Sequence, residues 1–383
     1  MKKIKVKNSI VCKNDDSVFN YYAWPTVTRL PDGTLAALAS GFRLEHLCPF
    51  GKVILCRSRD EGESWSEPSV IIDTPLDDRD SGIAVFGNNN VIVTSFNNTV
   101  AFQRKYLGQK LHGARGRLAG SYLDSIDAQK CESKYLGSTY KISKDGGYTF
   151  GELKRAPVTS PHGPCELPDK SLLYVGSVYG DTDAVCQIRC YTLNEMGDFE
   201  YLSSIEDVGG KEGALLSCEP HALALPNGKI IVHIRMQNKA GPAGEGEKPV
   251  FTIYQSESYD RGKTFTTPHS IGLQSGAPAH LMRHSSGVLI SSYGYREEPF
   301  GQRVMLSRDD GETWDTDYIL REDGPSFDLG YPSTVELKNG ALLTVYYQQE
   351  AGRNNCVIMQ SIWNLPENQN DELMPQAQAW LSE

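Results

Sequence analysis

The sequence lacks an excess of positive charge and any long apolar run. Its 383 residues carry 38 Lys and Arg against 48 Asp and Glu, a net charge of −10. We therefore expect no basic face for nucleic acid or an anionic membrane. No stretch approaches the roughly 20 apolar residues of a membrane-spanning helix. The basic segment at 1–7 is not followed by an apolar core of signal-peptide length, which predicts a cytoplasmic protein.

Cysteine motifs are absent too. The nine cysteines are odd in number, scattered, and without C-x-x-C spacing. Cys186 and Cys190 are close in sequence but do not suggest a zinc site. We expect reduced thiols that pack as small apolar side chains.

What the sequence does contain is a repeated pattern, Ser-x-Asp-x-Gly-x-x-aromatic. Four copies occur, at 58–65, 143–150, 258–265 and 307–314. The copies follow apolar alternating runs, so each is predicted to close a β-hairpin. The Asp can accept backbone N–H groups, the Gly can adopt positive φ, and the aromatic ring can hold the turn against its sheet.

A second repeat consists of an apolar strand interrupted by a polar turn and then resumed. Five copies begin at Trp24, Pro161, Glu219, Pro278 and Tyr331, and a looser sixth begins at Asp80. Six copies, with 36 Gly and 20 Pro, predict an all-β protein: a single six-bladed β-propeller domain over residues 1–383, with about 64 residues per blade. Each copy would form the innermost strand of its blade, so these first residues should surround one axial pocket.

The remaining segments are assigned around this ring. We expect the strand at 4–11 to pair beside 356–363 and to close the last blade, which would cover two sheet edges. The third blade has a degenerate turn at 187–197. Helix signals are few: the insertions at 104–134 and 238–248 are predicted to be loops over one face, and 368–382 a short C-terminal helix.

The four turns are Asp boxes, and with them the sequence resembles the sialidase (neuraminidase) superfamily. That resemblance implies a six-bladed propeller with the Asp boxes at the blade periphery, away from the catalytic face. It extends to the segment from Glu219 to Arg235, and to Arg303 followed by Tyr331. The resemblance implies that Tyr331 is the nucleophile and Glu219 its general base. It further implies that Arg235 and Arg303 bind the substrate carboxylate.

The chemistry of sialic acid explains these residue types. The sugar carries a carboxylate on its anomeric carbon, which would repel an Asp or Glu nucleophile. Tyrosine is neutral at pH 7, with an ordinary pKa near 10, and can attack once a carboxylate takes its proton. Guanidinium groups bind a planar carboxylate through two hydrogen bonds and keep their charge.

Two departures from the family pattern concern the arginines and the acid. The element Ala23-Trp24-Pro25 stands where the family has Arg-Ile-Pro, so that arginine is missing, and Arg43 or Arg296 are candidates to replace it. The family's acid is an Asp on the loop that corresponds to 41–51, which here contains none. Glu45, His46 and Asp80 remain as candidate proton donors, since histidine can donate near neutral pH.

Four histidines fall near strand starts or loops of one face. A metal site would require four blades to deliver four rings to one point, so we expect no metal and no cofactor. Some rings are expected to bind sugar hydroxyls and others to be structural, and Trp24 is either a sugar-stacking platform or a core residue. The candidate substrate-binding residues are Arg235, Arg303, Arg296, Arg43, Trp24, His162, His221 and His280. The candidate catalytic residues are Tyr331, Glu219, His46, Asp80 and Glu45.

These expectations favour a sialidase-like exo-glycoside hydrolase that releases a terminal acidic sugar with retention from an oligosaccharide or glycoconjugate. One alternative is a hydrolase of the same fold that acts on a non-sialic sugar, with a histidine in proton transfer. Another is a glycan-binding propeller without catalysis.

Overall fold

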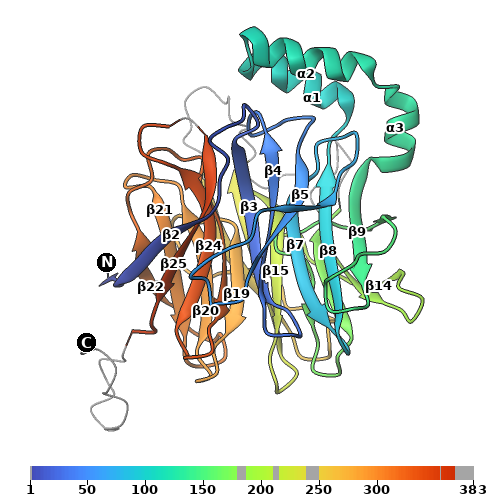
Figure 1. The fold of residues 1–383 in the computed structure, drawn as a ribbon. Helices are drawn as coiled ribbons and strands as arrows, with labels where there is room; N and C mark the ends of the chain where they lie inside the picture. The colour runs from blue at the N-terminus through green and yellow to red at the C-terminus, as the bar shows by residue number, and fades with distance from the viewer. Residues whose placement is uncertain (1, 179–186, 210–214, 239–249, 354, 367–383) are drawn as a thin grey trace.

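The structure is a computed structural model that describes residues 2–178, 187–209, 215–238, 250–353 and 355–366. The helix predicted at 368–382, and the 238–248 insertion apart from Asn238, lie outside these residues. Six antiparallel sheets are arranged around a central axis (Figure 1). The predicted six-bladed β-propeller is therefore confirmed.

The blades follow one another in chain order, and each is built from neighbouring antiparallel strands. Blade 1 contains β3 (Tyr21–Arg29), β4 (Leu35–Arg43), β5 (Lys52–Ser58) and β6 (Ser69–Ile72). Blade 2 contains β7 (Arg79–Phe86), β8 (Asn90–Asn97), β9 (Gly137–Ser143) and β10 (Lys154–Arg155). Blade 3 contains β11 (Cys165–Glu166), β12 (Leu172–Ser177), β13 (Ile188–Leu193) and β14 (Phe199–Ile205).

The second half of the ring repeats this order. Blade 4 contains β15 (Leu215–Ala224), β16 (Ile230–Asn238), β17 (Phe251–Ser258) and β18 (His269–Ser270). Blade 5 contains β19 (Ala279–Arg283), β20 (Leu289–Tyr295), β21 (Gly301–Ser307) and β22 (Asp315–Arg321), with β1 (Lys2–Lys3) added in parallel to β22. Blade 6 contains β23 (Gly330–Glu336), β24 (Leu342–Gln349), β25 (Cys356–Trp363) and β2 (Val6–Cys12).

Blade 6 combines strands from both ends of the chain. Strand β2 pairs antiparallel with β25, with Val6 opposite Trp363. The outer edge of β25 is thereby covered by the same chain, as a closed ring requires.

The four repeated turns share one hydrogen-bond pattern. In the first, the Gly62 N–H donates to Ser58 Oγ at 2.8 Å and the Ser64 N–H to Asp60 at 2.9 Å. The same pair of bonds occurs in the other three turns. The aromatic residue ties neighbouring blades together, because Trp65 Nε1 donates to Gln360 on β25 at 2.9 Å.

The insertion after β8 is helical, so the prediction of a loop at 104–134 is wrong. It forms α1 (Val100–Lys110), α2 (Gly113–Ser125) and α3 (Ala128–Tyr135), which lie above one end of the propeller (Figure 1). The side chains of Thr99 and Asp127 cap the first and third helices. Leu107 and Leu123 pack in an apolar cluster with Leu44 and other residues of the blade 1 loop. Tertiary packing therefore stabilises helices whose own amphipathic pattern is weak.

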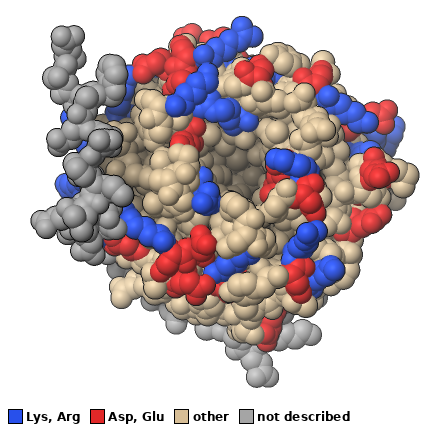
Figure 2. Space-filling model, turned by 90° about the horizontal axis from the view of Figure 1, so that it is seen from below, with Lys and Arg blue, Asp and Glu red and all other residues tan. Residues whose placement is uncertain are grey.

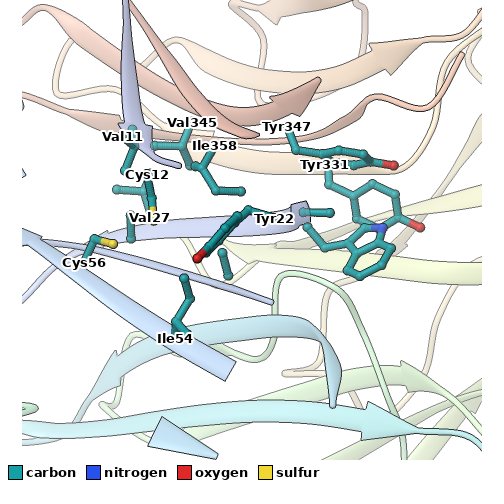
Figure 3. Close-up of a cluster of buried hydrophobic side chains, with 14 of the residues drawn as sticks. Val11, Cys12, Tyr22, Val27, Ile54, Cys56, Tyr331, Val345, Tyr347 and Ile358 are labelled. Atoms are coloured by element: carbon teal, nitrogen blue, oxygen red, sulfur yellow. The ribbon is translucent and has the colours of Figure 1, made fainter. Parts of the chain in front are cut away.

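The largest apolar cluster lies between blades 1 and 6. Figure 3 shows Val11, Cys12 and Cys56 at one end of this cluster and the rings of Tyr331 and Tyr347 at the other. The buried core that joins the two blades thus reaches the inner strands near the axis. No described helix is long and apolar enough to cross a membrane.

The face opposite the helices is hollowed at its centre (Figure 2). A cavity of about 400 Å³ there is lined by inner-strand residues of the blades, including Val85 and Met282, and by His162, His221 and His280.

Candidate active site

Four inner strands share an unusual backbone feature. Trp24, Asp80, Glu219 and Tyr331 have φ of +54°, +49°, +45° and +49°. Beside each of them the pairing of the first strand with the second shifts register. A non-glycine residue with positive φ costs roughly 1–2 kcal/mol, and such bulges redirect side chains next to active sites. Blades 1, 2, 4 and 6 thus present one side chain each from equivalent positions.

The hydroxyl of Tyr331 donates a hydrogen bond of 2.7 Å to Glu219 Oε1. Arg235, on β16 of the same blade as Glu219, contacts the other carboxylate oxygen at 2.5 Å and the Tyr331 oxygen at 3.3 Å. The structure therefore brings together three of the residues that the sequence singled out, from blades 4 and 6.

The charges of this group reinforce one another. Burial acts to raise the pKa of Glu219, but Arg235 and the Tyr331 hydrogen bond outweigh it and hold that pKa below its ordinary value. Burial, with Glu219 and Asp80 nearby, raises the pKa of Tyr331 well above 10. At neutral pH the pair is therefore an ionised carboxylate that accepts from a protonated phenol.

Asp80 is a buried carboxyl close to Glu219 and Tyr331. It is 3 % exposed, and its Oδ1 has no hydrogen-bond partner among the described residues. Burial raises its pKa to about 7, opposed by Arg79 and assisted by Glu219. A carboxylic acid that titrates near neutrality can donate a proton there.

Arg296, rather than Arg303, is the blade 5 guanidinium that reaches this group. Arg296 Cζ lies 5.7 Å from the centre of the Tyr331 ring, and its Nη2 donates to the Leu329 carbonyl at 3.1 Å. Arg303 is 2 % exposed and donates to the Arg321 carbonyl at 2.6 Å within its own blade. The substrate-binding assignment of Arg303 is therefore corrected, because β21 directs its side chain into the blade.

Trp24 and Arg43 are core residues, so their assignment to substrate binding is also corrected. Trp24 is 0 % exposed and therefore offers no free face to a sugar. The Arg43 side chain is fully buried as well, pairs with Asp77 at 2.6 Å, and lies with its Cζ 4.8 Å from the centre of the Trp24 ring. The Arg43 guanidinium therefore packs against the Trp24 indole inside the protein.

The loop after β4 holds the other two candidate acids. Glu45 accepts the backbone N–H of His46 at 2.9 Å. His46 Nδ1 contacts Asp328 Oδ1 at 3.1 Å, and its Nε2 lies 3.4 Å from Arg79 Nη2. Arginine has no acceptor, so His46 Nε2 must carry the lone pair and Nδ1 the proton.

Sequence reasoning missed Asp328 and Arg79. Asp328 lies three residues before Tyr331 and accepts hydrogen bonds from Tyr21 at 2.9 Å and Tyr347 at 3.1 Å. Arg79 directly precedes Asp80, and its Cζ lies 4.2 Å from the centre of the Trp24 ring. Their nearness in sequence to two candidate residues was a usable signal, since neighbours in a bulged strand reach the same pocket.

The three axial histidines are mutual neighbours. The rings of His221 and His280 stack with centroids 4.5 Å apart, and His162 lies 5.1 Å from His280. His221 Nδ1 accepts the Leu281 N–H, and His280 Nδ1 accepts the Thr334 N–H, each from the next blade. These two rings join adjacent blades, and His162 Nδ1 contacts Thr26 of blade 1.

Burial lowers the pKa of all three rings well below 6.5, so they are neutral. Among the residues that the structure describes, no three His, Cys, Asp or Glu side chains are placed to hold a metal ion. His221 and His280 thus make contacts between blades and also line the cavity on the face opposite the helices.

No family model and no curated protein sequence matches this chain. Solved structures do resemble it. One is a protein of unknown function from Dyadobacter fermentans, with a TM-score of 0.72 and 20 % identity over 94 % of this chain and 99 % of that chain. The second is a GH93 α-L-arabinofuranosidase of Fusarium graminearum in complex with arabinobiose, with a TM-score of 0.64 and 14 % identity over 94 % and 98 %.

The third is the NanB sialidase from Streptococcus pneumoniae, with a TM-score of 0.61 and 14 % identity over 93 % of this chain and 70 % of that chain. At such identities the likeness concerns the fold and not the activity. The chain has the six-bladed β-propeller fold of sialidases and of this arabinofuranosidase.

Proposed function

We propose that this protein is a retaining exo-glycoside hydrolase of the sialidase type that releases a terminal acidic sugar. The observation that carries the proposal is the 2.7 Å hydrogen bond from Tyr331 to Glu219, with Arg235 on the same carboxylate. A phenol of raised pKa needs a base in direct contact before it can attack. Glu219 is ionised and in place to take that proton.

The reaction has two steps. In the first, the Tyr331 oxygen bonds to the anomeric carbon as its proton passes to Glu219, and Asp80 protonates the departing glycosidic oxygen. In the second, Asp80 takes a proton from water, whose oxygen displaces the Tyr331 oxygen, and Glu219 returns the proton to the phenol. Two inversions at one carbon leave the configuration retained.

Asp80 is the best supported of the three candidate acids. Its pKa of about 7 keeps a large fraction protonated at neutral pH. The Nε2 of His46 faces the guanidinium of Arg79, which only donates, and its Nδ1 faces Asp328. Glu45 is turned toward the backbone of His46.

The acidic sugar is supported by the guanidinium groups beside the nucleophile. Arg235 and Arg296 both act to lower the pKa of Glu219, so both lie close enough to attract a substrate carboxylate. An anomeric carboxylate would also explain a neutral phenol in place of a carboxylate nucleophile.

A second candidate is a hydrolase of the same fold that acts on a non-sialic sugar such as an arabinofuranoside. The missing arginine of blade 1 favours it, because the buried Ala23 stands where the family resemblance implied an arginine. The Fusarium enzyme supports it through fold alone.

Aryl glycosides test the two candidates side by side. Wild type and Tyr331→Phe would be assayed with 4-methylumbelliferyl α-sialoside and α-L-arabinofuranoside, and the first-formed anomer of the product identified by NMR. We expect hydrolysis of the sialoside with retention, and its loss in Tyr331→Phe. The matched control is Tyr346→Phe, since Tyr346 is a buried tyrosine of the same blade whose hydroxyl contacts Ser361 and Arg321.

Cleavage of the arabinofuranoside alone would favour the second candidate. Binding of either sugar with no release of methylumbelliferone would contradict both and identify a glycan-binding propeller.

A further inference from the structure

Arg79 is a buried cation close to Asp80 and Tyr331. The proposed reaction does not use it. It opens β7 and directly precedes Asp80. Its side chain is 10 % exposed, and its contact with Asp80 Oδ1 is 3.7 Å long, beyond hydrogen-bond distance. Its Nε is buried without a hydrogen-bond partner among the described residues. Arginine cannot shed its charge, so a buried guanidinium with an unused donor is costly unless something binds it.

Trp24 holds this guanidinium beside the reaction centre. Arg79 Cζ lies 4.2 Å from the centre of the Trp24 ring, well within cation–π range. The same indole ring lies 6.5 Å from the ring of Tyr331. Arg79 and the Tyr331 phenol therefore both neighbour the Trp24 ring, with Arg79 on the side of blades 1 and 2.

His46 and Asp328 fix the direction of the guanidinium. Arg79 Nη2 lies 3.4 Å from His46 Nε2, which accepts because arginine only donates. His46 is held in turn by Asp328, at 3.1 Å from its Nδ1. Asp328 is anchored by the hydroxyls of Tyr21 and Tyr347. A chain of contacts across blades 6, 1 and 2 thus orients the Arg79 guanidinium, whose ion pair with Asp80 is 3.7 Å long.

A guanidinium with donors in a fixed plane matches a carboxylate better than it matches a hydroxyl. We propose that Arg79 binds a carboxylate of the sugar that binds beside Tyr331 and Glu219. Trp24, His46 and Asp328 are positioning residues for it. That the ligand is a sugar rests on the proposed function.

The test is calorimetric and needs no turnover. Wild type, Arg79→Met and Arg79→Lys would be titrated with two acid and neutral pairs: N-acetylneuraminic acid with its methyl ester, and glucuronic acid with glucose. In at least one pair, wild type should bind the acid about 10- to 150-fold more tightly, the range of one charge-assisted hydrogen bond. Arg79→Met should lower that preference at least tenfold, and Arg79→Lys should lower it less, because it keeps the charge but not the planar fork.

Arg57→Met is the matched control. Arg57 also lies over an aromatic ring, with its Cζ 5.4 Å from the Tyr148 ring, but it belongs to β5, which carries none of the candidate site residues. The preference of Arg57→Met for the acid over the neutral sugar should equal that of wild type. Thermal unfolding would show which variants are folded, and should Arg79→Met fail to fold, Arg79→Lys decides. Wild type without preference for either acid, or a folded Arg79 variant with unchanged preference, would overturn the proposal.

Asp328→Asn separates positioning from general stability. It should weaken binding of the acid and leave binding of the neutral partner unchanged, whereas a purely structural role would weaken both equally. The experiments also distinguish a failure of the proposed function from a failure of the Arg79 proposal. Arg79-dependent acid binding without hydrolysis of any aryl glycoside would contradict only the proposed function. Hydrolysis with no effect of Arg79 on acid preference would contradict only this inference.

Discussion

The Tyr331 hydroxyl donates to the Glu219 carboxylate at 2.7 Å, across 112 positions of sequence and between two blades that flank blade 5. Blade 4 carries the acceptor and blade 6 the donor. The bond exists because both inner strands are bulged at the same place and turn one side chain toward the axis.

Replacing the acceptor should remove most activity without unfolding the protein. In Glu219→Gln the amide cannot take the phenol proton, and we expect kcat to fall by about 10²- to 10⁴-fold, the range for a lost general base. Steady-state kinetics on the glycoside that wild type cleaves would measure this. Glu257→Gln, a buried carboxylate of the same blade that contacts Gln255 and Thr266, should keep wild-type kcat. Equal losses in both variants would contradict the assignment.

Activity should decline as the pH rises through the pKa of Asp80. This carboxyl must be protonated to assist the leaving group, and its pKa is about 7. The alkaline limb of kcat/KM should therefore fall near pH 7. Asp80→Asn should cost far less with a methylumbelliferyl leaving group than with an alkyl glycoside, since the phenolate leaves without a proton. An unchanged alkaline limb in Asp80→Asn would show that another group is the acid.

The axial histidines should make stability depend on pH. Their pKa lies well below 6.5 in the folded protein, so the unfolded chain binds protons below pH 6.5 that the folded protein does not. Each ring therefore lowers the free energy of unfolding by about 1.4 kcal/mol per pH unit below 6.5. The buried carboxyls of Asp78 and Asp80, raised to about 7, act in the opposite direction.

His280→Asn isolates one ring, because the amide oxygen can still accept the Thr334 N–H. Its pH slope in urea unfolding between pH 5 and 6.5 should be shallower than that of wild type by about 1.4 kcal/mol per pH unit. Parallel slopes would mean that His280 is protonated in the folded state.

A methyl group on Gly62 should destabilise the first repeated turn. Gly62 has φ of +89°, and an added Cβ would lie 2.3 Å from Leu343 Cδ1 of blade 6. Gly228 has φ of +90° with nothing within 4 Å, so Gly228→Ala measures backbone strain alone. We expect Gly62→Ala to lower the free energy of unfolding by about 1 kcal/mol or more beyond Gly228→Ala. Identical midpoints of urea unfolding would contradict the predicted clash.

The repeats in the sequence were enough to predict the six-bladed architecture. The spacing of residues alone did not predict the full set of residues at the candidate site. The residues that open the repeats, Glu219 and Tyr331, meet because equivalent positions in a ring face one axis. The choice between Arg303 and Arg296 depended on the direction of a side chain at the end of a strand, which sequence spacing does not determine. Asp328 lies outside every repeat and reaches His46 only because blade 6 is packed against blade 1.

The helical insertion was missed for a different reason. Its apolar residues pack against the loop after β4 and do not form a regular apolar face on their own helices. Thr99 and Asp127 are typical helix N-caps, but α1 and α2 have no clear helical period of apolar residues.

Because blade 6 is assembled from β2 and β25, the ring cannot close on the ribosome until the last sheet has emerged. Glu219 and Tyr331 lie between these two strands in the chain, so both are synthesised before the ring can close. A nascent chain stopped before β25 would have the strands of five sheets and an unpaired N-terminal strand β2.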